Sequence, residues 1–406
     1  MFATTGFRKI SELLIIGLCL FFAAALSSCA ENDLTRSLGD PFGFFKSTAE
    51  DETCPALQEK PVRNIILLIG DGMGLGQVAL AQMATVGADG KLHMQKLPIS
   101  GLLRTHSAGG IVTDSAAAAT AMACGIKTNN GVISMDPAGN KYMTILEATK
   151  EKIMRTGLVA TSAITHATPA CFGAHVKDRD NEVVIAEQLL ANKINVLLGG
   201  GRIFFLPKEN GGERKDKRNL IEKAKKAGYH YIGTGKQLAD ARGPFLLGLF
   251  QDEGLTTFRP EPTLSELTDK AIEILNKNNK GFFLMVEGSQ IDWACHDNDK
   301  YYAVKQTVDF DEAVKTAVDF ATADGRTLVI VTADHETGGL IVLDEEEIEG
   351  INTKCSWATD GHSAMPVPVY AFGPGATDFA GVYDNTQLPK KMAKLLGIKQ
   401  FPKALE

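Results

Sequence analysis

The sequence lacks the features expected of a nucleic-acid-binding protein or of a thiolate zinc site. The 406 residues carry a formal net charge of −7 at pH 7, whereas a nucleic-acid partner calls for a basic footprint. The seven cysteines include no Cys-x-x-Cys pair, which is the usual arrangement of a thiolate zinc site. No internal repeat is visible. Hydrophobic residues make up 44% of the chain, so we expect a globular protein with a large core and no nucleic-acid partner.

Long apolar runs are scarce as well, and the main one lies at the N-terminus. Residues 13–26 are apolar, follow Arg8 and Lys9, and are too few to cross a bilayer comfortably. The pattern is typical of a secretory signal. Its ending, LSSC at residues 26–29, resembles the lipobox of bacterial lipoproteins, in which the cysteine is lipidated. The alternative is a plain signal peptide that happens to contain a cysteine.

We therefore expect an exported protein of the periplasm or cell envelope, held at a membrane only by a lipid on Cys29. The expected parts are a signal peptide over 1–29, a tether over 30–60 and a folded domain over 61–402. Export would permit disulfides, but five cysteines follow Cys29, and five cannot all pair within one chain. We predict no disulfide among these five, which are Cys54, Cys124, Cys171, Cys295 and Cys355.

Short apolar runs alternate with helical patterns along the rest of the chain. The runs that indicate buried strands are 64–69, 157–160, 196–198, 281–286, 327–331 and 367–372. A capping box at Thr263–Glu266 precedes one helical pattern, and residues 301–321 form another. The alternation predicts an α/β fold with a large, mostly parallel central sheet flanked by helices on both faces. The lysine-rich stretch 202–262 is predicted to be a solvated surface insertion.

Polar side chains gather where the predicted strands end. Asp71, Glu287 and the segment 334–336 each follow a strand, and His166 and Thr168 follow another. In open α/β sheets, ligands bind beyond the carboxyl ends of the strands. Polar residues after one strand would mean little, because acids are common there. Polar residues after four strands that end at the same edge of the sheet are hard to explain by solvation alone.

The residue types at these exits indicate metal ions. Carboxylates with imidazole suit zinc, and an all-oxygen set suits magnesium. Asp292 and His296 are four residues apart, so on a helix they share a face. A lone histidine is more often structural, but three of the chain's eight histidines stand in such glycine- or acid-rich segments. These three are His296, His335 and His362.

A candidate nucleophile precedes an alanine-rich helix. Asp114 and Ser115 stand at its start, and Gly125 ends it. A helix N-terminus offers free N–H groups to a phosphate, although an N-cap alone would also explain these two residues. Metal coordination is one way to activate a serine. Arg179 is a candidate phosphate clamp, and its alternative is an ordinary surface arginine.

Six motifs, taken together, resemble those of the alkaline phosphatase family: DGMG, TDSAAAATA, THATPACFGAHV, EGSQIDWACH, TADHETGG and DGHSAMPVPV. They stand in family order from Asp71 to His362, and the set is highly specific although DGMG alone would be weak. The resemblance implies a catalytic domain over 61–402 that hydrolyses phosphate monoesters through a phosphoserine, with a broad substrate range. It implies a site with two zinc ions and one magnesium ion, and the release of inorganic phosphate.

The resemblance also implies a role for each matching residue. Ser115 would be the nucleophile, Arg179 would bind the substrate phosphate, and Asp114 would orient Arg179. The first zinc would be held by Asp292, His296 and His362, the second by Asp71, Asp334 and His335, and the magnesium by Asp71, Thr168 and Glu287. His166 and Trp293 would border the substrate, and they stand where the family varies between this pair and an acid with a lysine. The third site could therefore accept a different metal, and a lysine contact to phosphate is missing.

Two further points bear on the resemblance. Only 26 residues separate His335 from His362, where larger members carry a big insertion, so a homodimer would lack the contacts of that insertion.

Two other functions compete with a phosphomonoesterase. One is a phosphodiesterase or sulfatase of the same superfamily, and the other is a non-catalytic lipoprotein that binds metal or phosphate.

Overall fold

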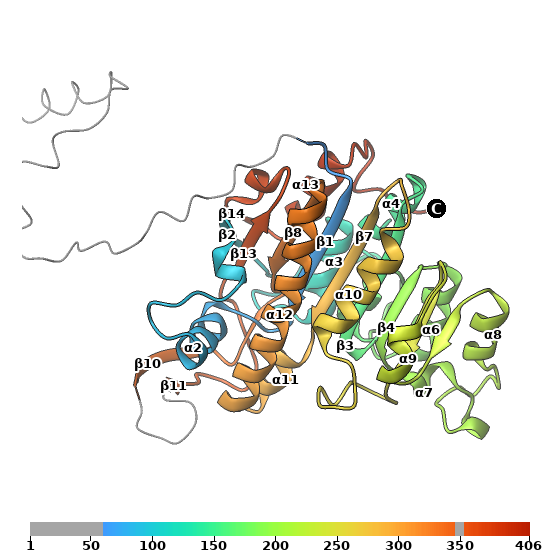
Figure 1. Ribbon diagram of the computed structural model, residues 1–406, viewed down its shortest axis with the longest axis horizontal. Helices are drawn as coiled ribbons and strands as arrows, with labels where there is room; N and C mark the ends of the chain where they lie inside the picture. Colours follow the sequence, from blue (N-terminus) through green and yellow to red (C-terminus); the bar gives the residue numbers. More distant parts are fainter. Residues whose placement is uncertain (1–59, 346–352) are drawn as a thin grey trace, which may run out of the picture. The chain divides into compact units, whose positions relative to one another are not determined.

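The computed structural model describes residues 60–345 and 353–406 (Figure 1). The predicted signal peptide, Cys29, Cys54 and all but the last residue of the predicted tether lie outside the described residues. Contacts group the described residues into one compact unit. Within the described ranges, no helix combines the length and the apolar character needed to cross a membrane.

A ten-stranded sheet forms the centre of the fold, in the order β14-β2-β13-β8-β1-β7-β3-β4-β6-β5. Every neighbouring pair is parallel except the two pairs made by β13, which runs antiparallel to β2 and β8. The prediction of a mostly parallel sheet is confirmed. The strands are β1 (Asn64–Gly70), β2 (Ile99–Arg104), β3 (Arg155–Ala163), β4 (Val196–Gly200), β5 (His230–Ile232), β6 (Leu246–Leu249), β7 (Phe282–Gly288), β8 (Thr327–Thr332), β13 (Val367–Phe372) and β14 (Gly381–Asp384).

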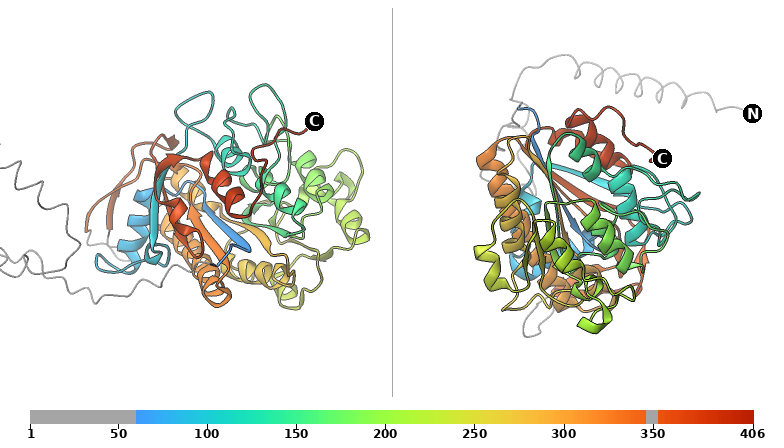
Figure 2. Two further views of the ribbon diagram at one scale, coloured as in Figure 1. Left: turned by 90° about the horizontal axis from the view of Figure 1, so that it is seen from above. Right: turned by 90° about the vertical axis from the view of Figure 1, so that its right-hand side faces the viewer.

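Helices cover both faces of this sheet (Figure 2), as predicted. The long helix α12 packs with α10 on one face, while α3, α4, α5 and α13 pack on the other. Because both faces are covered, the central strands β1, β7 and β8 are buried along their whole length and read as continuous apolar runs. The helices are α2 (Leu75–Thr85), α3 (Ser115–Cys124), α4 (Ile145–Glu151), α5 (Ala167–Ala170), α6 (Glu182–Ala191), α7 (Arg202–Phe205), α8 (Leu220–Lys226), α9 (Gly235–Asp240), α10 (Leu264–Leu275), α11 (Gln290–His296), α12 (Lys300–Asp324) and α13 (Gln387–Leu395).

Local sequence signals account for several helix ends. The capping box predicted before α10 is present, with Thr263 Oγ1 accepting from the Glu266 amide. Helix α3 ends at Gly125, whose φ of 72° lies in the left-handed region that glycine adopts without steric cost. Three of the predicted free thiols, Cys124, Cys171 and Cys295, are free and buried.

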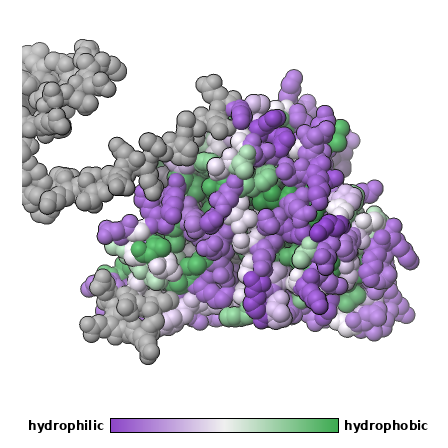
Figure 3. All heavy atoms as spheres, in the orientation of Figure 1, coloured by the Kyte–Doolittle hydropathy of each residue, from purple (hydrophilic) through white to green (hydrophobic). Residues whose placement is uncertain are grey.

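The prediction that 202–262 is a surface insertion is wrong for part of that stretch. Strands β5 and β6 lie in it and extend the main sheet beyond β4. All four residues of β6 are buried, because their side chains lie between the sheet and its covering helices. The lysines of α8 are solvent-exposed, as expected, and Figure 3 shows mainly hydrophilic residues over that helix. The sequence analysis also missed β2 and the edge strand β14.

The direction of β13 places a further segment at the carboxyl edge of the sheet. Since β13 is antiparallel to β8, the residues that precede β13 lie at the same edge as the residues that follow β1, β3, β7 and β8. A two-residue ladder fixes this segment, in which β12 (His362–Ser363) pairs with β9 (Glu336–Thr337). A small hairpin of β10 (Ile341–Glu345) and β11 (Thr353–Ser356) lies beside α2.

Candidate metal centre

The carboxyl edge of the sheet brings together the acidic and histidine residues that the sequence singled out. Three sets of side chains each place one possible ligand atom apiece within 4.8 Å of one another. The sets share Asp71 and His335, so they form one continuous cluster. They consist of Asp292, His335 and His362; of Asp71, Asp334 and His335; and of Asp71, His166 and Glu287.

The first predicted zinc group lies at the solvent-facing side of the cluster. His296 Nε2 is 3.2 Å from His362 Nε2 and 3.4 Å from Asp292 Oδ2. His362 Nε2 is 3.5 Å from Asp292 Oδ1. Helix α11 supplies both Asp292 and His296 with the four-residue spacing that the sequence predicted to share a face. The His296 side chain is 41% exposed, so this group borders solvent.

The second predicted zinc group is fully buried. His335 Nε2 is 3.3 Å from both Asp71 Oδ1 and Asp334 Oδ2. Asp71 and His335 follow the neighbouring strands β1 and β8, which explains why residues 264 positions apart come together. Ser115 Oγ lies 3.2 Å from the same His335 nitrogen. The candidate nucleophile therefore contacts the second group.

The third group contains one more residue than the sequence analysis assigned to it. Asp71, Thr168 and Glu287 were predicted as ligands, and all three are buried here. A ring nitrogen of His166 also lies within 4.8 Å of a carboxylate oxygen of Asp71 and of one of Glu287. His166 was predicted only to border the substrate. Its signal was present in the sequence, because it stands two residues before Thr168 on the same segment.

Buried polar atoms without a hydrogen-bond partner indicate that this cluster binds cations. Six of the ten buried side-chain atoms without a hydrogen-bond partner in the described part of the chain lie here. Buried oxygens without a partner are costly, and a metal ion would satisfy them. They are both carboxylate oxygens of Asp71, one each of Asp334 and Glu287, Thr168 Oγ1 and His166 Nδ1.

Electrostatics lead to the same conclusion. Burial, reinforced by Asp334 and Asp292, raises the pKa of Asp71 well above its usual value. Burial likewise raises the pKa of Glu287 to about 7. Although burial opposes it, hydrogen bonds from His296 and His362 hold the pKa of Asp292 well below its usual range. Several carboxylates that repel one another in one buried cluster are stabilised when divalent cations are bound.

The residues around Ser115 position Arg179. Asp114 is the N-cap of α3, and its Oδ1 accepts from the Ala117 amide at 2.9 Å. Its Oδ2 accepts from Arg179 Nη1 at 3.1 Å and from the Gly131 amide at 2.9 Å. Asp114 therefore caps α3 and also contacts Arg179. Arg179 Nη2 donates to His166 Nε2 at 3.2 Å, so the guanidinium lies between Ser115's helix and the third group.

The sequence and structure of known proteins match this arrangement. The family model for alkaline phosphatase matches residues 62–350 and 344–398. Alkaline phosphatase 3 of Bacillus subtilis (strain 168) is 38% identical over 419 residues, covering 82% of this chain and 89% of the relative. The chain belongs to the alkaline phosphatase family. It is thus an enzyme of a family of phosphomonoester hydrolases.

Solved alkaline phosphatases share the fold. The structure from the Antarctic bacterium TAB5 is 37% identical, with a TM-score of 0.77, and the match covers 84% of this chain and all of that one. A TAB5 variant with an aspartate in place of a histidine, 36% identical with a TM-score of 0.75 and the same coverage, has magnesium bound in its M3 site. Metal binding thus accompanies this fold in a close structural relative.

Trp293 lies beside the third group of this family member. Its ring is edge-on to His166, with ring centroids 6.3 Å apart. Gly254 lies directly against it, since a Cβ at that position would be 2.5 Å from Trp293 Cη2. The loop before α10 therefore approaches the tryptophan closely only because residue 254 is glycine.

The sequence analysis missed the residues that hold the ligands in place. Thr337 Oγ1 donates to Asp292 and lies 3.2 Å from His335 Nδ1, so it links the first two groups. Ser289 and Ser162 donate to Glu287 Oε2 at 2.7 and 3.3 Å. Partners of this kind orient metal ligands. Thr337 could have been found from its position two residues after His335.

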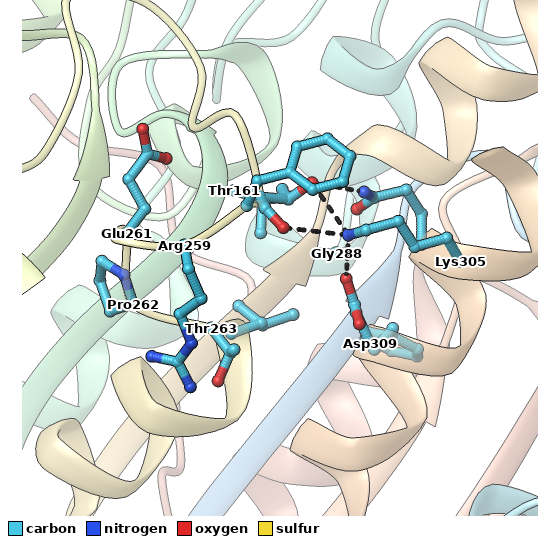
Figure 4. Close-up of a pocket in the computed structure, with 13 residues that line it drawn as sticks. Thr161, Arg259, Glu261, Pro262, Thr263, Gly288, Lys305 and Asp309 are labelled. Atoms are coloured by element: carbon cyan, nitrogen blue, oxygen red, sulfur yellow. Dashed lines mark hydrogen bonds and ion pairs between the residues drawn. The ribbon is translucent and has the colours of Figure 1, made fainter.

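A separate cavity lies on the other side of the strand ends. It has a volume of about 230 Å³ and is lined by Thr161 and Gly288 together with residues of α12 and the loop before α10 (Figure 4). Lys305 Nζ donates there to the Thr257 carbonyl at 3.0 Å and to Asp309 Oδ2 at 2.6 Å. None of the unpaired buried atoms lines this cavity.

Proposed function

We propose that this member of the family hydrolyses phosphate monoesters through a phosphoserine on Ser115 and releases inorganic phosphate. The observation that carries the proposal is the contact of Ser115 Oγ with His335 Nε2, at 3.2 Å. Through this contact a nucleophile at the N-terminus of α3 lies beside a cluster of candidate metal ligands. Because only the phosphate needs to be recognised for this chemistry, the substrate range is broad.

Two zinc ions and one magnesium ion fit the ligand atoms. When bound, they would stabilise the charge on the attacking and leaving oxygens of an in-line displacement. The presence of His166 beside the third group is the reason that this site could accept another metal. The first zinc would be held by Asp292, His296 and His362, the second by Asp71, Asp334 and His335, and the magnesium by Asp71, Thr168 and Glu287.

The side chains of this chain bind the phosphate and form the phosphoserine. Ser115 Oγ forms the new bond to phosphorus while the bond to the alcohol oxygen breaks. Arg179 donates two hydrogen bonds to non-bridging phosphate oxygens, and Asp114 holds the guanidinium in that orientation. His166 and Trp293 border the phosphate on the side of the third group. A water molecule then attacks the phosphoserine, which releases phosphate and restores Ser115.

Trapping the phosphoserine tests the proposal. Protein quenched at acidic pH during turnover of a phosphate monoester should gain one phosphate, and peptide mapping should place it on Ser115. Ser115→Ala should lose the adduct and nearly all turnover, whereas Ser100→Ala, at an exposed position of β2, should retain both. A wild-type rate in Ser115→Ala would contradict the covalent route. Faster turnover of a diester than of a monoester would favour a phosphodiesterase.

The proposal includes export and a lipid anchor at Cys29, supported by the basic, apolar and LSSC pattern of residues 8–29. One acyl chain gives only marginal binding, and two or more give stable anchoring. Cys29→Ser should move activity from the membrane pellet to the soluble fraction without loss of metal, since every proposed ligand lies at or after Asp71. A soluble wild-type protein whose mature N-terminus is not Cys29 would contradict the anchor.

A further inference from the structure

Three exposed apolar residues stand three or four positions along the chain from Ser115 or His362. Ile111 is 76% exposed, Met365 is 59% exposed and Val112 is 36% exposed. Single exposed apolar residues need no explanation. These three, however, come from two segments that a hydrogen bond between His362 and Thr113 joins beside the reaction centre. A group of exposed apolar residues beside a site is a candidate binding surface. We call these three residues the apolar rim.

Hydrogen bonds fix the rim relative to the site. His362 Nδ1 bonds to the Thr113 carbonyl at 2.8 Å, which joins the segment of Ile111 and Val112 to the segment of Met365. Asn130 Nδ2 donates to the Val112 carbonyl at 3.3 Å, and Asn130 Oδ1 accepts from the Asp114 amide at 3.2 Å. The rim is therefore tied to the residue before the nucleophile and to a ligand of the first group.

The direction of the reaction places the alcohol of the substrate at this rim. In phosphoryl transfer the attacking and leaving oxygens are roughly in line, on opposite sides of phosphorus. In the proposed function one ligand group stabilises the attacking oxygen and another the leaving oxygen. Ser115 Oγ contacts His335 of the second group, which leaves the first group, Asp292, His296 and His362, for the alcohol oxygen. That side borders solvent, because the His296 side chain is 41% exposed. The carbon skeleton of the alcohol must pass out there, beside His362.

Charges around the site disfavour an anionic alcohol part. Asp360 lies beside the first group, where its carbonyl bonds to His296 Nδ1, and its carboxylate adds negative charge. Asp180 and Glu253 interact electrostatically with Glu182, near Arg179, and add further negative charge. An uncharged apolar group avoids repulsion from these carboxylates and removes rim surface from water.

We infer that the apolar rim is the leaving-group surface and that this enzyme prefers phosphate monoesters of uncharged, apolar alcohols. The inference rests on the proposed function and narrows its substrate class. Recognition of the phosphate remains general, and the rim adds a preference that grows with the apolar area of the alcohol.

A homologous series of substrates tests the inference. Methyl, ethyl, propyl and butyl phosphate have alcohols of similar acidity, so the series changes apolar area with little change in leaving-group chemistry. The wild-type kcat/KM should rise by about two-fold for each added methylene, which corresponds to about half of complete burial. The double variant Ile111→Ser/Met365→Ser should flatten this rise while changing methyl phosphate turnover by less than about two-fold.

A matched control is Ile153→Ser, since Ile153 is 72% exposed but precedes β3 at the opposite edge of the sheet. This variant should keep the wild-type slope. A flat series in the wild-type enzyme, or an unchanged slope in the double variant, would overturn the inference while the phosphomonoesterase activity stands. No hydrolysis of any member, methyl phosphate included, would overturn the proposed function and the inference with it.

Discussion

The ligand cluster and the cavity of Figure 4 lie on two sides of the same strand ends, and they differ in how their polar groups are paired. In the cavity, Lys305 bonds to Thr257 and Asp309, and Gln306 Nε2 donates to Thr257 Oγ1 at 2.7 Å. In the cluster, Asp71 has two buried oxygens without a hydrogen bond, and its neighbours have more. The cavity is a hollow of about 230 Å³, but its polar side chains already satisfy one another.

The difference shows which feature identifies a site. Polar groups that are hydrogen-bonded to one another do not require a ligand. Buried oxygens without a hydrogen-bond partner are costly, and a bound cation would satisfy them. The raised pKa values of Asp71 and Glu287 have the same origin, because burial and nearby carboxylates disfavour their charged forms. We therefore assign function to the cluster and a structural role to the residues of the cavity.

The largest expected effect comes from exchanging one carboxylate for an amide in each region. Asp334→Asn removes a proposed ligand, so kcat/KM should fall by at least about 100-fold, which is the upper range for outer-shell partners alone. Asp309→Asn weakens only the partly exposed pair with Lys305, so kcat/KM should change by less than about two-fold. Steady-state assays of purified, metal-loaded protein measure both.

Stability separates ligand loss from misfolding in these two variants. Metal-free Asp334→Asn should melt at or above the temperature of the metal-free wild type, since it loses one repelling charge. Asp309→Asn should melt slightly lower with or without metal. Equal losses of activity in the two variants would remove the distinction between the regions.

An intermediate effect is expected for the two arginines that border these regions. Arg179→Ala should lower kcat/KM for a monoester by ten-fold or more, because charge-assisted hydrogen bonds contribute about 1.5–3 kcal/mol each. The loss for a diester should be much smaller, since a diester has only two non-bridging oxygens and an extra substituent. Arg259, which pairs with Glu266 beside the cavity, provides the control, and Arg259→Ala should leave both rates unchanged. An equal loss on both substrates in Arg179→Ala would indicate a structural role.

The smallest expected effect is on thermal stability, and it concerns two glutamates whose side chains have different hydrogen-bond partners. Burial raises the pKa of Glu182 to about 7, and its main partner is the neutral Thr165 hydroxyl at 2.6 Å. A raised carboxyl pKa gives stability that is present below the unfolded value and is lost as the pH rises through about 7. The Tm of Glu182→Gln relative to the wild type should therefore be about 2 °C higher at pH 8 than at pH 5.

The pKa of Glu147 is shifted in the opposite direction to that of Glu182. Although burial opposes it, the hydrogen bond with His175 lowers the pKa of Glu147, so its stabilisation is present above the unfolded pKa. Glu147→Gln should lower Tm at pH 7, and thermal melts of both variants across this pH range measure the contrast. A fall in Tm for both at pH 8 would show that Glu182 is stabilised as an anion.

Much of the fold could be predicted because its strands are short apolar runs bounded by polar residues. Strands β1, β7 and β8 were found in this way, and so was the helix that starts at Ser115. Strands β5 and β6 were missed, because a lysine-rich, glycine-broken surrounding concealed the four buried residues of β6. The direction of β13 could not be deduced from local pattern, since it depends on which strand β13 pairs with.

The site could be predicted as a list of residues but not as a geometry. The strand exits identified Asp71, Glu287 and Asp334, and the motif resemblance supplied their grouping. The membership of His166 in the third group depends on how the β3–α5 loop folds back toward Glu287. The role of Thr337 depends on a ladder between β9 and β12, each only two residues long, which leaves almost no periodic signal.

The central claim is that the unpaired buried oxygens of the cluster hold metal ions required for phosphate ester hydrolysis. Elemental analysis of the purified, dialysed protein tests it most directly, with activity toward a monoester measured on the same samples before and after chelation. We expect two zinc ions and one magnesium ion per chain, loss of activity with their removal, and recovery when both metals are restored. Full activity in a protein that holds less than one metal ion per chain would contradict the account.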